Sequence, residues 1–175
     1  VVGFSARVLD DSLPKYINTP ETAIYHKSNI LFGFDKGKEA ARKQDHVILV
    51  EGNMDVIFSY QAGVKNVAAA SGTALTEGQL NLIKRVTRNI KISFDIDAAG
   101  QSATRRAIEL AQEKGFNLKV IEVPEGKDPA DLVKNDPKKW ILACKKAKYV
   151  IDYIFESTFT KYDITNILDK KRATK

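Results

Sequence analysis

The sequence predicts an α/β domain with a compact, mainly parallel sheet flanked by helices, preceded by a β-rich segment and followed by a helical one. The first observation is a series of short apolar runs near 47–50, 66–70, 91–95 and 118–123, as expected for parallel strands buried on both faces. The second is that segments of helical character near 54–62, 76–88 and 99–114 separate these runs. This alternation is typical of right-handed crossover connections within one sheet.

Residues 1–44 precede these strands and form the first predicted domain. The segment 4–9 alternates between apolar and polar residues, which favours a strand, while Pro14 and Pro20 disfavour a helix. Residues 34–44 are expected to form a polar helix or a loop.

Residues 45–125 form the second predicted domain, and local signals mark the ends of its helices. Thr76 and Gln79 approximate a capping box at a helix start. Asp97 stands where the N-cap of the next helix is expected, and Gly115 stands where a C-cap is expected. These signals support the alternating pattern.

Residues 126–175 form the third predicted domain, which is expected to be helical. After a loop at 124–129, helices are expected at 130–134, at 137–146, from 149 to about 159 and at 163–172. Apolar residues from Trp140 to Phe159 have helical spacing. This tail is expected to be the beginning of a larger helical region.

The composition indicates an ordinary soluble protein. The chain has 175 residues, 43% hydrophobic and 29% charged, which is enough for one full core. No apolar run approaches the roughly 20 residues that a membrane span needs. Cys144 is the only cysteine, which excludes an internal disulfide and a cysteine-based zinc site. We therefore expect a cytoplasmic protein without membrane contacts and, because no heptad pattern is present, a monomer.

The charge favours polyanionic partners. Lysine and arginine number 28 against 22 aspartates and glutamates, which gives a net charge of +6. The isoelectric point is about 9.3. A basic protein of this kind is suited to phosphate-bearing ligands, although many basic domains bind no nucleic acid.

Two acidic clusters stand at the ends of predicted strands. Glu51 and Asp55 follow the run 47–50, and Asp95 and Asp97 lie at the end of the run near 91–95. Because parallel strands present ligands at their carboxyl ends, these carboxylates are expected to converge. Oxygen ligands suit Mg²⁺, so the sequence predicts a metal-dependent site for phosphate chemistry.

Each cluster also has a plainer interpretation. Glu51 and Asp55 flank Gly52 in a tight turn into a helix, where acidic residues favour the helix dipole. Asp97 could serve only as an N-cap. Asp128, which follows the last predicted strand, could be a metal ligand or could cap a helix that has Pro129 at its first position.

Several motifs of this chain occur together in a known order. Glu-Gly-x-x-Asp at 51–55 is followed by Asp-x-Asp-x-Ala-Gly at 95–100, and this pair resembles the signature of the Toprim domain. With the segment 14–27, the run Ala-Ser-Gly-Thr-Ala-Leu-Thr at 70–76 and Gly-Lys-Asp-Pro at 126–129, the chain more narrowly resembles bacterial DNA primases of the DnaG type. These motifs occur in the family's order over about residues 1–160, which is more specific than either acidic cluster.

The resemblance implies a fragment of the primase RNA polymerase core, which synthesises short RNA primers on single-stranded DNA by metal-dependent nucleotidyl transfer. It implies catalytic roles for Glu51, Asp95 and Asp97. It implies that Mg²⁺ or Mn²⁺ is held by Glu51, Asp55, Asp95, Asp97 and Asp128, and that nucleotide and template are bound by Lys15, Asn18 and Lys27. Implied partners are the DNA template, ribonucleoside triphosphates and, through regions absent here, the replicative helicase; no zinc is expected in this fragment.

Further residues are candidates for contact with the template strand. Tyr16 and Tyr25 could stack on bases, since single-strand binding combines basic grooves with aromatic side chains. Basic residues on two predicted helices could steer the strand or could simply form a solvated face: Lys84, Arg85, Arg88, Arg105 and Arg106.

The chain departs from the family pattern at three positions. Ile96 replaces the glycine usually found between the two aspartates, and Asn53 stands where an aromatic residue is common. Ala130 stands where many relatives have a second aspartate, and Asp131 comes one residue later. Whether Asp131 substitutes for the missing carboxylate is left open by the sequence.

Two other enzyme classes share part of the signature. Topoisomerases and some nucleases contain the Toprim acidic clusters but lack the segment with Lys15 and Lys27. Haloacid-dehalogenase-like phosphatases also have Asp-x-Asp after a strand, but they require a nearby Thr or Ser and a later Lys, and residues 98–100 offer neither at the expected place.

Overall fold

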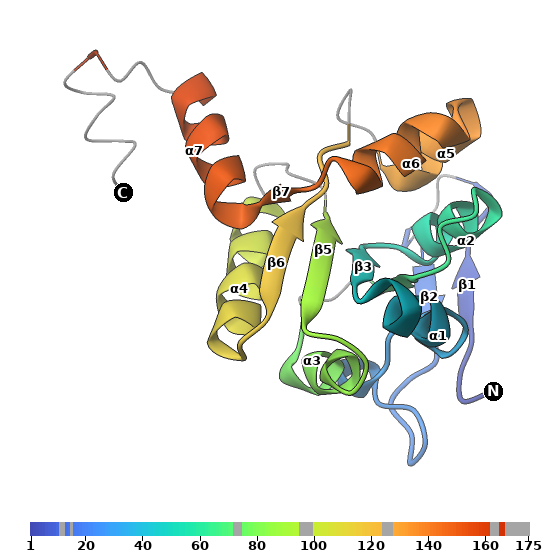
Figure 1. Ribbon diagram of the computed structural model, residues 1–175. Coiled ribbons are helices and arrows are strands. Elements are labelled where there is room, and N and C mark those ends of the chain that lie inside the picture. Colours follow the sequence, from blue (N-terminus) through green and yellow to red (C-terminus); the bar gives the residue numbers. More distant parts are fainter. Residues whose placement is uncertain are drawn as a thin grey trace.

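The computed structural model describes residues 1–10, 13–14, 16–71, 75–94, 100–123, 128–161 and 165–166, and only the backbone at 100–105, 157, 160 and 161. Its elements (Figure 1) are β1 (Ser5–Arg7), β2 (Tyr16–Asn18), η1 (Lys27–Asn29), α1 (Phe34–Gln44), β3 (Val47–Val50), α2 (Asn53–Gln61), β4 (Val67–Ala69), α3 (Glu77–Lys84), β5 (Asn89–Ser93), α4 (Gly100–Glu113), β6 (Asn117–Val120), α5 (Pro129–Asn135), α6 (Pro137–Lys145), β7 (Lys148–Tyr149) and α7 (Val150–Lys161).

The main sheet has five strands in the order β4-β3-β5-β6-β7. The first four strands in this order are parallel, and β7 is antiparallel to β6. Val50, at the end of β3, is in register with Ala69 of β4 and with Ser93 of β5. The predicted α/β class and its mainly parallel sheet are therefore confirmed.

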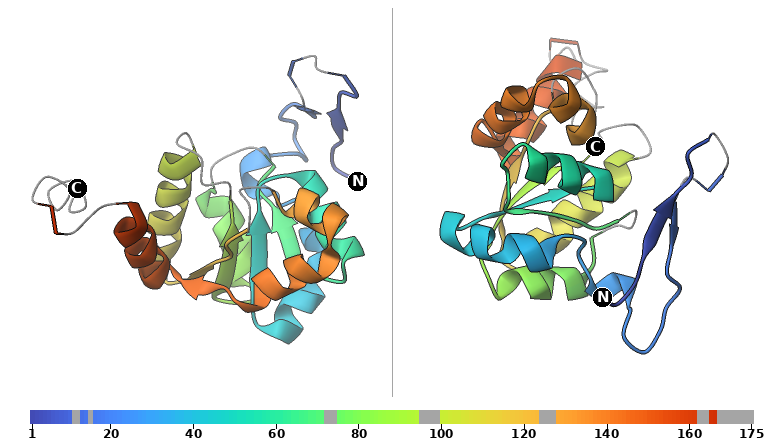
Figure 2. Two further views of the ribbon diagram at one scale, coloured as in Figure 1. Left: turned by 90° about the horizontal axis from the view of Figure 1, so that it is seen from above. Right: turned by 90° about the vertical axis from the view of Figure 1, so that its right-hand side faces the viewer.

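Helices cover both faces of this sheet. One core cluster joins the strands to α1, α3, α4 and α7 and includes Ala41, Leu80, Ile108 and Val150. The other joins the strands to α2, α5 and α6 and includes Val56, Val133 and Trp140. In the right-hand view of Figure 2 the sheet lies between the two layers of helices.

The N-terminal segment forms a second, smaller sheet, in which β1 pairs antiparallel with β2. Figure 2 shows this hairpin standing away from the main sheet. The chain returns to the main sheet at Phe32, which exchanges backbone hydrogen bonds with Ala69 at the edge of β4, 2.9 and 3.0 Å long. This link holds the two parts together beside the carboxyl ends of the strands.

The local helix signals behave as predicted where the structure describes them. The Thr76 side chain accepts a hydrogen bond from the Gln79 N–H, and the Gln79 side chain accepts one from the Thr76 N–H, which completes a capping box. Gly115 has a φ of +77°, the left-handed conformation typical of a glycine after a helix. Asp97, the other predicted cap, lies outside the described residues.

The expected helix from residue 149 was wrong at its start. Lys148 and Tyr149 form β7, which pairs with Val120 and Lys119 of β6, and the helix begins at Val150. So short a strand has no periodicity of its own, and the exposed edge of β6 is what makes it a strand. The expected helix at 163–172 lies almost entirely outside the described residues.

The predicted boundary between 125 and 126 does not separate two cores. Although they follow this boundary, α5 and α6 pack on the sheet through Leu132, Val133 and Trp140. Beyond them, α7 exposes Ile154 and Phe155. The division into three domains, with its two boundaries, stays a prediction. Within the described part of the chain, no helix combines the length and apolar character that crossing a membrane requires.

Candidate active site

The candidate site lies at the carboxyl end of β3, where the turn with Glu51 and the first turn of α2 follow the strand. The chain continues from β3 to β4 on one side and from β5 to β6 on the other, so the connections after β3 and β5 leave the sheet in opposite directions. A crevice forms at such a switch point, and open α/β sheets bind their ligands there. Glu51 directly follows β3 at this position and is exposed.

The turn after β3 is fixed to the turn after β4. The carbonyl of Glu51 accepts a hydrogen bond of 3.1 Å from the N–H of Ser71. The Ser71 hydroxyl donates to Oδ1 of Asn53, the first residue of α2, at 2.5 Å. Ser71 has a φ of 59°, an uncommon conformation for a residue with a side chain. The backbone that presents Glu51 is thus held from two sides.

Asp55 is buried in the first turn of α2, with 6% of its surface exposed. Its Oδ2 accepts a hydrogen bond of 2.9 Å from the N–H of Gly52, and its Oδ1 accepts one of 3.2 Å from the N–H of Ala130. Each carboxylate oxygen therefore accepts a hydrogen bond from a backbone N–H. This is a structural role that the sequence did not reveal, and the metal role of Asp55 stays a prediction.

Asp128 is the N-cap of α5, and its Oδ1 accepts a hydrogen bond of 2.7 Å from the N–H of Asp131. Of the two roles that the sequence left open, the structure shows the cap. The Asp55–Ala130 bond places this cap beside the first turn of α2. Asp131 itself is exposed.

The remaining predicted ligands, Asp95 and Asp97, lie outside the described residues, as does Lys15. Among the described residues no group of three or more His, Cys, Asp or Glu side chains could hold a metal ion. The hard oxygen donors of Glu51 and Asp128 suit a divalent cation, but as a set they are incomplete. The fit of the site to a metal therefore depends on Asp95 and Asp97.

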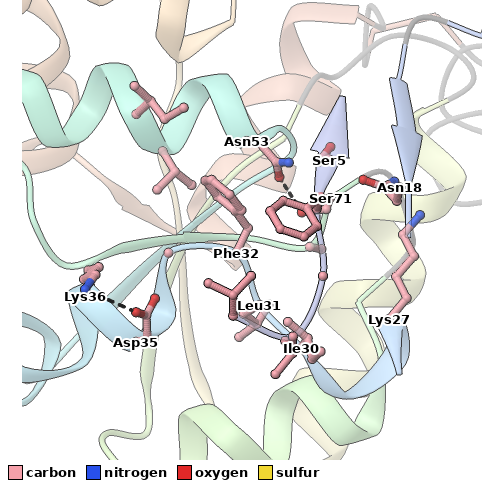
Figure 3. A pocket seen from close by; sticks show the side chains of 18 of the residues that line it. Ser5, Asn18, Lys27, Ile30, Leu31, Phe32, Asp35, Lys36, Asn53 and Ser71 are labelled. Atoms are coloured by element: carbon pink, nitrogen blue, oxygen red, sulfur yellow. Dashed lines mark hydrogen bonds and ion pairs between the residues drawn. The ribbon is translucent and has the colours of Figure 1, made fainter. Parts of the chain in front are cut away.

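A cavity of about 840 Å³ opens between the N-terminal segment and α2. Its polar side chains include Asn18, Lys27, Asn53 and Ser71, so two predicted template residues share one cavity with the turn that holds Glu51 (Figure 3). Apolar side chains form much of the remaining wall: Phe4, Ile30, Leu31, Phe32, Val56 and Ile57. Glu51 itself does not line the cavity.

Lys27 is positioned by a buried glutamine. Gln79 is fully buried, and its Nε2 donates to the carbonyls of Lys27 and Ile30 at 3.3 and 2.9 Å. The Thr76 hydroxyl also donates to the carbonyl of Ser28. The capping box of α3 therefore anchors the short helix η1, which carries Lys27.

Lys27 is partly buried, and its ammonium group has no carboxylate partner among the described residues. The nearby Glu21 accepts a hydrogen bond from the backbone N–H of Lys27 and one from the His26 ring, at 2.9 and 2.8 Å. These bonds lower the pKa of Glu21, so it is ionised at neutral pH. Glu21 orders the segment without pairing the Lys27 ammonium.

The aromatic and basic residues predicted to contact the template strand lie in different parts of the structure. Tyr25 lines the cavity, while Tyr16 lies on β2 with the Arg7 guanidinium 5.7 Å from its ring centroid. Lys84, the last residue of α3, and Arg85 and Arg88, which follow it, are exposed near the start of β5. They lie at the amino edge of the sheet, away from Glu51. Arg106 on α4 is exposed, and the side chain of Arg105 is not described.

Sequence reasoning missed Gln79 as a support for Lys27, because a capping-box residue carries no signal for its second role. It also missed the Asn53–Ser71 contact. The departure from the family pattern at Asn53 was visible, but its partner lies 18 residues away.

Two family models match the chain. Residues 1–38 match the N-terminal domain of the DNA primase catalytic core, and residues 48–133 match a Toprim-like domain. A DNA primase of Clostridium acetobutylicum is 42% identical over 165 residues, which are 94% of this chain and 28% of that protein. The chain spans only about a quarter of the length of the curated relatives it matches.

Solved structures of DNA primases are also similar to this chain. The Aquifex aeolicus primase, with its zinc-binding and RNA polymerase domains, superposes with a TM-score of 0.82 and 31% identity over 99% of this chain and 42% of that one. A DnaG primase catalytic domain bound to single-stranded DNA gives 0.80 and 31% identity over 99% of this chain and 57% of that one. The chain therefore belongs to the family of bacterial DnaG-type DNA primases, as a segment of the RNA polymerase core that contains the Toprim-like domain.

Proposed function

We propose that this chain contributes the Toprim part of a DNA primase, which synthesises short RNA primers on single-stranded DNA during replication. The observation that carries the proposal is the shared cavity: Asn18 and Lys27 of the N-terminal segment line it together with Asn53 and Ser71, which hold the turn of Glu51. A cavity of this kind can bring template and nucleotide close to the turn that carries Glu51.

In the proposed mechanism Glu51, Asp95, Asp97 and Asp128 hold Mg²⁺ or Mn²⁺, with Asp55 as a further ligand or as the support of the two loops. Divalent cations bound there would lower the pKa of the attacking 3′-hydroxyl and neutralise the triphosphate. Lys27, together with Lys15, would supply a compact positive charge to the phosphates. Asn18 and Tyr25 would contact the template or the nucleotide.

We propose single-stranded DNA and ribonucleoside triphosphates as partners of this segment. The DNA-bound catalytic domain that this chain resembles supports the first. A replicative helicase would bind other regions of the full primase. A monomer and a cytoplasmic location are also proposed. Both family models favour primase chemistry over a haloacid-dehalogenase-like phosphatase.

Paramagnetic broadening of backbone NMR signals by Mn²⁺ tests the metal site. We expect broadening around Glu51, Asp95, Asp97 and Asp128, and we expect a ribonucleoside triphosphate to shift the signals of Asn18 and Lys27. Asp95→Asn should weaken Mn²⁺ binding by about tenfold or more, since a charged ligand is lost. Unchanged Mn²⁺ affinity in that variant would overturn the ligand role.

Binding of fluorescent single-stranded DNA in the absence of metal tests the cavity separately. Lys27→Ala should weaken binding, while Lys138→Ala on the exposed side of α6 should change it little. Equal losses in the two variants would mean that net charge alone, and not this cavity, binds DNA.

A further inference from the structure

A second cavity, of about 390 Å³, lies at the other end of the same strands. The strand β5 runs from Asn89 at this end to Ser93 at the end nearer Glu51, a span of about 13 Å at roughly 3.3 Å per residue. The lining residues come from the starts of β3, β5 and β6 and from β7: Asp45, His46, Asn89, Ile90, Lys91, Asn117, Lys119 and Tyr149. This cavity is separate from the candidate active site.

Two lysines stand side by side in it. Lys91 of β5 and Lys119 of β6 are direct register partners on neighbouring parallel strands. Like charges placed opposite each other in a sheet repel, so this pair costs stability. Two like charges brought together in this way form a candidate site for an anionic ligand.

Neither lysine is neutralised within the described part of the chain. Lys91 Nζ donates to the carbonyl of Cys144 at the end of α6, at 2.9 Å. Lys119 Nζ lies 4.3 Å from the centroid of the Tyr149 ring. Burial lowers the pKa of Lys91, and the neighbouring Lys119 lowers it further, against an opposing effect of Cys144. These contacts position the ammonium groups but bring no negative charge to them.

The acidic residue of the cavity is engaged elsewhere. The Asp45 carboxylate accepts hydrogen bonds from the Thr87 hydroxyl and the Asn89 side-chain amide, at 2.8 and 2.9 Å. The Asn89 Oδ1 accepts in turn from Asn117. Asp45 is therefore held by uncharged donors on one side of the cavity, and it forms no ion pair with Lys91 or Lys119.

His46 lies beside the two lysines in this cavity, and a hydrogen bond fixes the tautomer of its ring. Because Nδ1 lies 2.8 Å from the carbonyl of Gln44, which can only accept, Nδ1 carries the proton. The other ring nitrogen, Nε2, is left to respond to a ligand. His46 lines the same cavity as both lysines.

We propose that this cavity binds a phosphate group between Lys91 and Lys119, with His46 at its edge. Ammonium groups bind phosphate as point charges, and charge-assisted hydrogen bonds are the strong ones. The phosphate could belong to a free nucleotide or to the backbone of a nucleic acid. The proposal does not depend on primase activity or on any metal.

NMR of the histidine rings tests the proposal directly. The chain has only two histidines, and His26 lies in the N-terminal segment on Glu21, so it serves as an internal control. At constant pH and ionic strength, inorganic phosphate should shift the His46 signals until they saturate and leave those of His26 unchanged. Chloride at the same ionic strength should shift neither.

Variants make the test specific. Lys119→Gln and Lys91→Met should each weaken phosphate binding by about tenfold, because each removes a charged donor. Lys91→Arg should restore most of it, and Lys138→Gln, an exposed lysine on α6, should have no effect. An unchanged His46 signal, or equal affinity in wild type and Lys119→Gln, would overturn the proposal.

Two further titrations distinguish the sources of phosphate. If a ribonucleoside triphosphate shifts His46 at lower concentration than inorganic phosphate, a free nucleotide is the ligand. If a single-stranded oligonucleotide does so and Lys119→Gln reduces it, the ligand is a nucleic acid backbone. If both shift His46 no more than chloride does, neither source uses the site and the proposal is wrong.

Discussion

The buried carboxylate of Asp55 accepts a hydrogen bond from the backbone N–H of Ala130, 75 residues further along the chain. The same carboxylate holds the N–H of Gly52, at the turn after β3. One side chain thus fastens the start of α2 to the start of α5. Because Glu51 precedes that turn and Asp128 caps α5, Asp55 determines how two other predicted metal ligands lie relative to each other.

We predict that Asp55→Ala lowers the free energy of unfolding by about 2 to 4 kcal/mol, since it takes the acceptor from two partly buried N–H groups and removes a buried, hydrogen-bonded carboxylate. The loss should be the same in metal-free buffer. Urea unfolding measures it, and hydrogen exchange of the Ala130 amide should become faster. Asp131→Ala, which removes an exposed carboxylate from the same region, is the control. A loss that appears only when metal is present would contradict the structural role.

Gln79 allows a test of how Lys27 is positioned, because its side chain donates hydrogen bonds to the carbonyls of Lys27 and Ile30. Gln79→Ala removes the donors to the carbonyls of Lys27 and Ile30 and the acceptor for the Thr76 N–H. We expect a loss of about 2 to 4 kcal/mol in stability, from the unpaired groups and the cavity left behind. Weaker binding of single-stranded DNA should accompany it, since Lys27 loses its anchor.

The matched control for Gln79 is Gln112→Ala, an exposed glutamine on α4. Binding should be measured well below the unfolding temperature of each variant, so that lost binding is not lost folding. If Gln79→Ala unfolds more easily but binds DNA as tightly as wild type, the anchoring of Lys27 is unimportant for DNA.

The sequence was sufficient for the fold wherever periodicity and caps act locally. The runs that became β3, β4, β5 and β6, the capping box at Thr76 and the C-cap at Gly115 were all predictable, because neighbouring residues determine them. β7 was not, because its pairing with β6 depends on an edge that only the folded sheet provides.

In the candidate site, too, local motifs could be predicted from the sequence and contacts between distant residues could not. Residue types and motif order identified Glu51, Asn18 and Lys27, and the structure places the last two in one cavity. The second bond of Asp55 and the support by Gln79 reach across 75 and about 50 residues. No pattern in a single sequence encodes such contacts, since they depend on how the helices pack.

Replacing Gly37 tests whether tight packing or helix propensity dominates at this position, because the two effects change stability in opposite directions. In an exposed helix, replacing glycine by alanine stabilises by about 0.5 to 1 kcal/mol. A Cβ at Gly37, however, would lie 2.9 Å from the carbonyl oxygens of both Lys65 and Val67, so α1 would have to move away from β4. We expect Gly37→Ala to destabilise by about 1 to 3 kcal/mol.

The control on the same helix is Lys38→Ala, which is exposed and should change stability by less than about 0.5 kcal/mol. Thermal and urea unfolding of both variants decide the question. A stabilised Gly37→Ala would mean that α1 shifts on the sheet without cost.

His46 makes stability depend on pH in a defined direction. Burial lowers the pKa of this ring, and the positive charges of Lys91 and Lys119 lower it further, against the opposing effects of the Gln44 carbonyl and Asp45. The unfolded chain therefore binds the proton more readily than the folded one. By linkage, the contribution is fully present above the ordinary pKa of 6.5 and is lost as the pH falls from there through the lowered pKa of the folded state.

We therefore predict that the free energy of unfolding falls as the pH is lowered from about 7.5 to 5.5, and that His46→Gln makes this fall shallower. The comparison isolates His46, because the carboxylates that titrate at lower pH are common to both proteins. His26→Gln is the control, since that ring lies exposed beside Glu21. Phosphate bound between Lys91 and Lys119 should reduce the difference between wild type and His46→Gln, because a negative charge beside the ring favours its protonated form. Parallel pH profiles for wild type and His46→Gln would mean that the ring is protonated equally easily in the folded and unfolded chains.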